Sequence, residues 1–192
     1  GNMEVAGVLA PGNSPGQLIV AGSVTQAAGS QLRLDIDGTT AGIGAGHFDT
    51  LILTGANSVF TAGGSIAPIT RGITGDATNE FTPTIGDAFQ VVVAEGGVEG
   101  SFDALVQPTE GMAANTRFDV LYLPDSVVLT VTADKYAKLF SGREWGNGAS
   151  LAGAVDTFRG AAGVRNTSAS GRFLEGLMGL NAQQAAAALQ QA

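Results

Sequence analysis

Short runs in which apolar and polar residues alternate, separated by turn-forming residues, constrain the fold of this chain more than any other feature of its sequence. In one run Leu32, Leu34 and Ile36 point to one side of an extended strand, while Arg33 and Asp35 point to the other. The first three predicted strands begin about 14 to 19 residues apart, farther than the roughly 8–12 residues typical of a β-sandwich. This spacing is nearer to one coil of a β-solenoid, whose short strands stack coil on coil. The predicted strands are Gln17–Ala21, Gln31–Ile36, Thr50–Thr54, Ser65–Ile69, Ala88–Ala94, Phe118–Tyr122 and Val127–Thr132.

The composition agrees with a turn-rich β protein. The 29 glycines among 192 residues are about twice the ordinary share of roughly 7%, and most of them fall between the apolar runs. A hydrophobic content of 44% with only 14% charged residues excludes a typical disordered chain. The net charge is −8, with nine Lys and Arg residues and no basic cluster. Nucleic acid and an anionic membrane surface are therefore disfavoured as partners.

The chain has no cysteine, which excludes disulfides and zinc sites of the cysteine type. The absence of cysteine fits a protein that must stay unbridged while it crosses an oxidising compartment. No run reaches the roughly 18 apolar residues of a membrane helix, and no signal peptide opens the sequence. Because Gly1-Asn2-Met3 resembles an expression remnant, we expect the chain to be a piece of a longer protein.

A tight turn joins the last two predicted strands. Pro124 stands at the second position of the turn and Asp125 follows it, an arrangement typical of a β-hairpin. The last coil of a solenoid exposes an unpaired edge that invites aggregation, so it needs a cover. We therefore expect residues 118–132 to fold across the end of the stack as a hairpin cap.

The strand pattern stops at about residue 133, and Ala-rich stretches with helical periodicity follow. Ser150–Arg159 and Gly171–Gly179 are predicted helices, and Asn181 is the expected N-cap of a third helix over Ala182–Ala192. We expect the link Gly160–Gly171 to be mobile and Trp145 to pack at the junction with the cap. The prediction is thus one unit of strands over residues 1–134 and a short helical tail, separate from the stack, over residues 135–192.

The stretch Gly12-Asn13-Ser14-Pro15-Gly16 matches G-x-S-x-G, the pattern of a hydrolase nucleophile elbow, and His47 and Asp49 lie downstream. The elbow needs a backbone N–H after the serine to stabilise the oxyanion, and Pro15 has none. A strand, not a helix, follows, and the Ser…Asp…His order of the hydrolase is broken. We therefore predict a rigid turn in which Gly12 and Gly16 permit a positive φ, and no catalytic residue.

Other candidate sites are equally weak. Asp35 and Asp37 suggest a calcium loop, but the rest of that pattern is missing, so we expect solvated aspartates at a strand end. His47 stands alone and is expected in a turn rather than as a metal ligand. A glycosidase would need a pair of carboxylates, and the pairs considered are Glu95 with Glu99 and Asp87 with Asp103. These carboxylates are expected to be ordinary surface groups. The sequence thus predicts no metal and no cofactor.

The segment Gly7–Leu18, with its Leu9, Pro11-Gly12 and Ser14-Pro15-Gly16, closely resembles the G-x-L-x-P-G-x-S-P-G-x-L motif of autotransporter passengers, which are bacterial type V secreted proteins. Four later segments resemble that family in the same order, so the resemblance covers about residues 7–134. These segments are Gly29–Ile36, His47–Gly55, Gly86–Ala94 and Val98–Phe102.

The resemblance implies a right-handed parallel β-helix that ends in a hairpin cap, with a short α-helical tail leading toward an outer-membrane barrel. In that family the corresponding region is an autochaperone, a non-catalytic stem that folds first and templates the coils before it. Its partners would be its own upstream coils and the C-terminal barrel, at the bacterial cell surface or in secreted form. An adhesin or self-association surface on the same β-helix stays open as an alternative. A fragment of a secreted hydrolase passenger also stays open.

Overall fold

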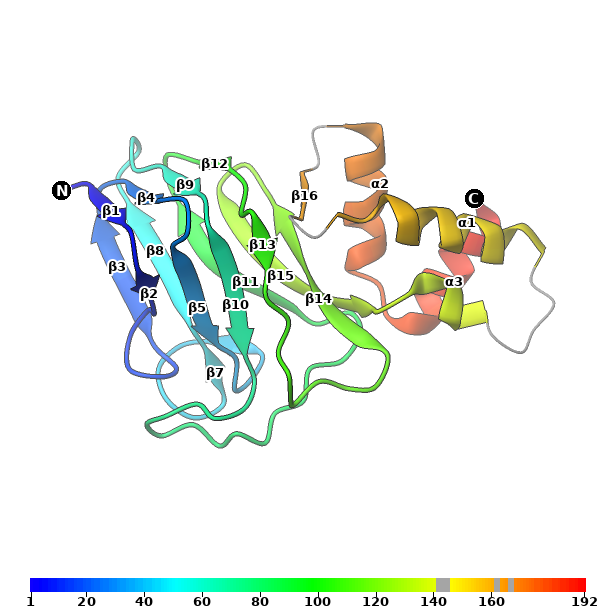
Figure 1. The fold of residues 1–192 in the computed structure, drawn as a ribbon, viewed down its shortest axis with the longest axis horizontal. Helices are drawn as coiled ribbons and strands as arrows, with labels where there is room; N and C mark the ends of the chain where they lie inside the picture. The colour runs from blue at the N-terminus through cyan, green and yellow to red at the C-terminus, as the bar shows by residue number, and fades with distance from the viewer. Residues whose placement is uncertain (141–145, 161–162, 166–167) are drawn as a thin grey trace.

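Three large sheets, a two-stranded sheet formed by β6 and β7, and a helical C-terminal part make up the computed structural model, which describes residues 1–140, 146–160, 163–165 and 168–192. The protein is mostly β, and the helices gather at the end of the molecule opposite the N-terminus (Figure 1). The strands are β1 (Met3–Val5), β2 (Val8–Leu9), β3 (Gln17–Ala21), β4 (Val24–Gln26), β5 (Gln31–Asp35), β6 (Thr40–Ala41), β7 (His47–Phe48), β8 (Thr50–Thr54), β9 (Phe60–Ala62), β10 (Ser65–Ile69), β11 (Ala88–Ala94), β12 (Val98–Gly100), β13 (Ala104–Leu105), β14 (Thr116–Tyr122), β15 (Ser126–Ala133) and β16 (Val164–Arg165). The helices are η1 (Tyr136–Phe140), α1 (Gly146–Phe158), α2 (Ala169–Met178) and α3 (Ala182–Gln191).

The chain visits the three large sheets in a fixed order. The first sheet is β1-β4-β9-β12 and the second is β2-β5-β10-β13, with parallel pairing throughout. The third begins β3-β8-β11, also parallel, and continues with β15, β14 and β16. Each of the first three passes along the chain therefore adds one strand to every large sheet, directly beside the strand of the pass before, and the fourth pass does the same in the first two sheets.

Side chains from successive passes stack inside the space that the three sheets enclose. Leu18 pairs in register with Leu51, which pairs with Val92, and Leu51 and Val92 are fully buried. Aromatic rings add a second contact along the core: Phe89 meets Phe48 edge-on at 5.3 Å between centroids and Phe118 at 6.0 Å. The core thus runs continuously from the first pass to the hairpin.

The hairpin predicted from Pro124 and Asp125 is present. Strands β14 and β15 pair antiparallel, with Tyr122 opposite Val127, and the Leu123 N–H donates to the Ser126 carbonyl at 2.9 Å. Strand β15 also pairs antiparallel with β11. The hairpin therefore extends the third sheet beyond its last parallel strand.

The three predicted helices are also present, with Asn181 as the N-cap of α3. Its side chain accepts from the Gln184 N–H while the Gln184 side chain accepts from the Asn181 N–H, which is a capping box. The expectation of a mobile link over 160–171 is wrong at Val164 and Arg165, which form β16 and pair with β14. Residues 161–162 and 166–167 of that link, and Trp145, lie outside the described residues.

The helical part does not merely follow the hairpin, because a buried arginine joins the two. Arg159 donates through Nη1 to Asp119 Oδ2 at 3.0 Å, to Thr132 Oγ1 at 2.9 Å and to the Ala133 carbonyl at 2.9 Å. Its Nη2 donates to the Asp134 carbonyl at 2.8 Å and to Asp156 Oδ1 at 3.0 Å.

In the part of the chain described, none of the helices is both long and apolar enough to span a membrane.

Candidate functional site

Ser14, His47 and Asp49, the residues of the suspected triad, make other contacts. His47 lies in strand β7 rather than in a turn, and its Nδ1 is 2.9 Å from the Ala45 carbonyl oxygen. Both Asp49 oxygens accept backbone N–H groups, from Gly16 at 2.6 Å and from Asp35 at 2.9 Å. Among the hydrogen bonds of the described residues, none joins Ser14 to His47 or His47 to Asp49. Asp49 instead ties the turn at residues 11–16 to β5.

The geometry of that turn differs in detail from the expectation. The positive φ falls on Gly12, at +73°, and on Ser14, at +37°, and not on Gly16. Gly16 is required for close approach: a Cβ on Gly16 would lie 2.6 Å from the Gly12 Cα, and a Cβ on Gly12 would lie 2.4 Å from the Gly16 Cα. Pro15 is buried beside it. The turn is therefore a tight corner whose two glycine backbones touch.

Asp35 and Asp49 form a buried pair of carboxyl groups beneath this corner. Each is only 1% exposed, so the expectation of a solvated Asp35 is wrong. Burial raises the pKa of Asp49 to about 7; the nearby Asp35 charge adds to the shift, while the N–H donors of Asp35 and Gly16 and the Arg33 charge oppose it. Neither carboxylate oxygen of Asp35 has a hydrogen-bond partner among the described residues.

Asp37 is also buried, at 2% exposure, and it anchors a long connection. It accepts from the Thr78 N–H at 2.7 Å, the Thr78 hydroxyl at 2.8 Å, the Asn79 N–H at 2.7 Å and the Gly46 N–H at 3.1 Å. Although burial acts in the opposite direction, these donors lower the pKa of Asp37 below its ordinary value. The connection after β10 therefore covers the residues just past the end of β5, which were predicted to be exposed to solvent.

The carboxylates considered as glycosidase pairs cap turns or face solvent. Glu95 accepts from the Gly55 N–H at 2.6 Å, and Asp87 accepts from the Thr84 N–H at 2.8 Å. Glu99 and Asp103 are exposed. Within the residues that the structure describes, no group of three or more His, Asp or Glu side chains is placed to hold a metal ion.

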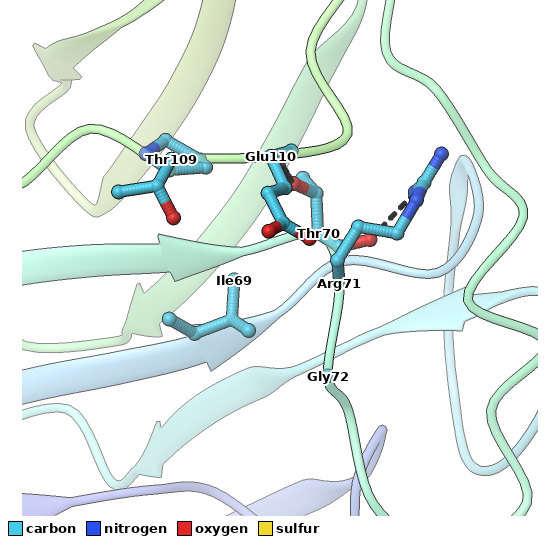
Figure 2. A pocket seen from close by; sticks show the side chains of 7 residues that line it. Ile69, Thr70, Arg71, Gly72, Thr109 and Glu110 are labelled. Atoms are coloured by element: carbon cyan, nitrogen blue, oxygen red, sulfur yellow. Dashed lines mark hydrogen bonds between the residues drawn. The ribbon is translucent and has the colours of Figure 1, made fainter.

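A pocket of about 280 Å³ opens between the residues that follow β10 and those that follow β13. Two of its polar side chains are already engaged: the Thr70 hydroxyl donates to the Glu110 carbonyl at 2.6 Å, and Arg71 Nη1 donates to the Thr70 and Phe81 carbonyls, both at 2.6 Å. Figure 2 shows the Arg71 guanidinium turned away from Ile69. The pocket thus presents no nucleophile paired with a base. It is lined by Ile69, Thr70, Arg71, Gly72, Pro108, Thr109 and Glu110.

The surface with the clearest capacity for binding is the N-terminal end of the sheets. Strands β1, β2 and β3 are outermost in their sheets, and no described strand pairs with their outer edges (Figure 1). Core residues of these strands are left half-buried, while Val8 and Ile19 are 64% and 63% exposed on the outside. An unpaired edge beside apolar side chains is a template for further strands. The half-buried core residues are Met3, Leu9, Leu18 and Val20.

The opposite end of the first sheet is closed. On the outer edge of β12, the Val98 N–H donates to the Pro124 carbonyl at 2.9 Å and the Phe102 N–H to the Tyr122 hydroxyl at 2.8 Å. Arg165 donates to the Val98 carbonyl at 3.4 Å and to the Gly100 carbonyl, with its guanidinium 4.7 Å from the centre of the Tyr122 ring. The hairpin and the helical part therefore form hydrogen bonds with backbone groups of β12 and the residues just after it, which would otherwise form a second open edge.

The third sheet is covered at the same end, and the chain just past β13 in the second sheet is tied to it. Gln107, just past β13, exchanges two hydrogen bonds with the backbone of Phe118, donating to its carbonyl at 2.8 Å and accepting from its N–H at 2.9 Å. In the third sheet β15 covers β11, β14 covers β15, and β16 covers Leu121 and Tyr122 at the end of β14. One end of the stack is thus sealed and the other is open.

Comparison with known proteins finds no matching family model, no matching curated protein and no matching solved structure. The chain's function therefore has to be argued from its own geometry.

Sequence reasoning missed Arg159 and Arg165, the two residues that fasten the C-terminal part. Apart from Asp156, which is three residues from Arg159, their hydrogen-bond partners lie 25 to 67 residues away along the chain, beyond the reach of any local pattern. One signal was available: both are isolated arginines in a segment dominated by Ala and Gly, where a buried cation needs a partner elsewhere in the fold.

Proposed function

We propose that the sheets form the end of a right-handed parallel β-helix, closed by the β14–β15 hairpin. The fixed order in which the chain visits three parallel sheets supports this, because each pass corresponds to one coil. The registers support it as well: Met3 pairs with Val24, and Val24 pairs with Phe60. In such a stack each coil is stabilised mainly by its neighbours, so coils are added one at a time.

We further propose that this β-helix is a non-catalytic stem, the autochaperone-like region of a bacterial autotransporter passenger, which nucleates folding and supports export across the outer membrane. The observation that carries the proposal is the difference between the two ends. A sealed end prevents growth in one direction, and an open end with half-buried apolar residues accepts the next coil in the other. The resemblance of residues 7–134 to such passengers gives the same answer from sequence motifs.

The partners follow from this assignment. The open end would receive the upstream coils of the same passenger, and the helical segment 135–192 would lead toward the C-terminal outer-membrane barrel. Residues 1–134 would then be the templating unit. The protein would act at the bacterial cell surface or in secreted form, without a reaction, metal or cofactor of its own.

Templating can be tested on this chain alone. Because Met3 pairs with Val24, one coil spans residues 3–23, and a second copy of that segment can be fused directly ahead of Met3. We expect the amides of the added coil to exchange with solvent on the order of tenfold or more slowly than those of a scrambled copy. Equal exchange in the two fusions would refute the templating role.

Export can be tested with matched substitutions in β4. Val24 is fully buried and its neighbour Thr25 is exposed. In a passenger that carries this segment, Val24→Asp should sharply reduce the amount that reaches the cell surface, because a buried unpaired charge unfolds the stem. Thr25→Asp should export normally. If Val24→Asp leaves export unchanged, the proposal that the stem supports secretion is wrong, even if the fusion experiment confirms templating.

A further inference from the structure

The buried carboxyl groups of Asp35 and Asp49 have no task in the stem beyond the hydrogen bonds of Asp49. Asp49 joins two segments: its Oδ1 holds the Gly16 N–H, directly before β3, and its Oδ2 holds the Asp35 N–H at the end of β5. The Thr50 N–H, next in sequence, donates to the Gly16 carbonyl at 3.0 Å. The attachment of β3, one of the three strands of the open end, thus depends on the state of this carboxyl group.

The side chain of Asp35 is the unexplained element. A carboxylate that is 1% exposed and has no hydrogen-bond donor among the described residues is unfavourable as an isolated charge. A second carboxyl group lies beside it, and like charges in one buried site disfavour double ionisation. Arg33, on the same strand and the same side as Asp35, is the one cation that acts on Asp49, and no ion pair joins it to either aspartate in the described part of the chain.

We propose that the buried carboxyl groups of Asp35 and Asp49 together bind one proton, and that this makes the order of the open end depend on pH. With the proton bound, the pair carries a single negative charge and Asp49 keeps its hold on Gly16. When that proton is released to solvent, two negative charges occupy one buried corner, and the turn at residues 11–16 is pushed away from β5. This regulation rests on the proposed function, because it acts on the strands that receive the next coil.

The direction of the effect follows from linkage. The pKa of Asp49 is raised to about 7 in the folded protein, whereas an unfolded aspartate titrates at its ordinary value of 3.8. Between these values the folded protein binds a proton that the unfolded chain does not. The stabilisation is therefore complete below about pH 4, is lost as the pH rises toward 7, and changes no further above that. The maximum slope is about a tenfold change in the opening equilibrium per pH unit.

Urea unfolding of the whole chain from pH 4.5 to 8 tests the global effect. We expect the urea midpoint to fall as the pH rises to about 7 and then to level off. Asp35→Asn, which keeps the shape but removes one carboxyl group, should move the fall of the midpoint to lower pH and raise the midpoint at pH 8, because burial of Asp49 remains while the neighbouring charge is gone. The exposed Asp103→Asn should reproduce the wild-type profile. A wild-type midpoint that does not depend on pH would overturn the proposal.

Carbon-13 NMR of the aspartate carboxyl groups tests the site directly and does not depend on unfolding. In the wild type the Asp49 carboxyl group should titrate near pH 7, and in Asp35→Asn its titration should move to lower pH because the neighbouring negative charge is gone. If millimolar calcium or magnesium chloride raises the urea midpoint at pH 8 and Asp35→Asn abolishes that rise, the pair binds a metal ion and the proton proposal is wrong. The coil fusion tests templating independently of this proton proposal, because the added coil and its scrambled control are compared at the same pH.

Discussion

Arg159 is the residue whose loss should be most damaging to the junction between the hairpin and the helices. Its side chain is 2% exposed, donates five hydrogen bonds and lies 4.6 Å from the centre of the Tyr136 ring. Arg159→Met keeps much of the apolar stem but removes the charge and every donor. Removing one partner of a buried ion pair costs about 3–5 kcal/mol. Asp119 keeps Arg117, which is 2.7 Å away, so we expect the lower half of that range, about 3 kcal/mol.

The assay is equilibrium urea unfolding at pH 7, followed by far-ultraviolet circular dichroism. Arg172→Ala is the matched control, since Arg172 is an exposed arginine of the same helical part and should change stability by no more than about 0.5 kcal/mol. Adding Asp119→Asn to Arg159→Met should recover part of the loss, because the stranded charge disappears. If Arg159→Met costs less than about 1 kcal/mol, the reasoning that the helices are fastened through this cation is refuted.

Two further substitutions probe local geometry by the same unfolding measurement. Gly12→Ala should destabilise the protein by about 1–3 kcal/mol more than Gly29→Ala: both glycines have a positive φ, but a Cβ on Gly12 would meet the Gly16 Cα at 2.4 Å, whereas Gly29 faces open space. Equal losses would mean that the corner is not tightly packed. Asn181→Ala should cost about 1 kcal/mol through loss of the capping box, while the exposed Gln183→Ala should be nearly neutral; a loss below about 0.3 kcal/mol for Asn181→Ala would count against the cap.

Much of the local structure could be predicted from the sequence. The strand over residues 17–21 was correct to the residue, because alternation and flanking turns are properties of neighbouring residues. The hairpin followed from Pro124 and Asp125, and the start of α3 followed from Asn181. Each of these features is decided within a few residues of chain, by backbone sterics or by one side-chain hydrogen bond.

The candidate sites fared differently. Asp35 and Asp37 read as solvated from the sequence and are buried, because the turn at residues 11–16 and the segment around Thr78 fold over them. Burial of a polar group depends on what a distant segment covers, and a local pattern carries no information about that. The burial of Asp49 beside Asp35, which raises the pKa of Asp49, was for the same reason invisible in the sequence.

By itself, the sequence determined that the chain would form short strands, one hairpin and three helices, because those choices depend on periodicity and turn chemistry over a few residues. The tertiary structure alone decided which edges remain open and which are closed. Arg165 reaches Val98, 67 residues earlier in the chain, and Arg159 reaches Asp119, 40 residues earlier. Such contacts form only after the chain has folded back on itself, so the open end at β1, β2 and β3 is a property of the assembled sheets.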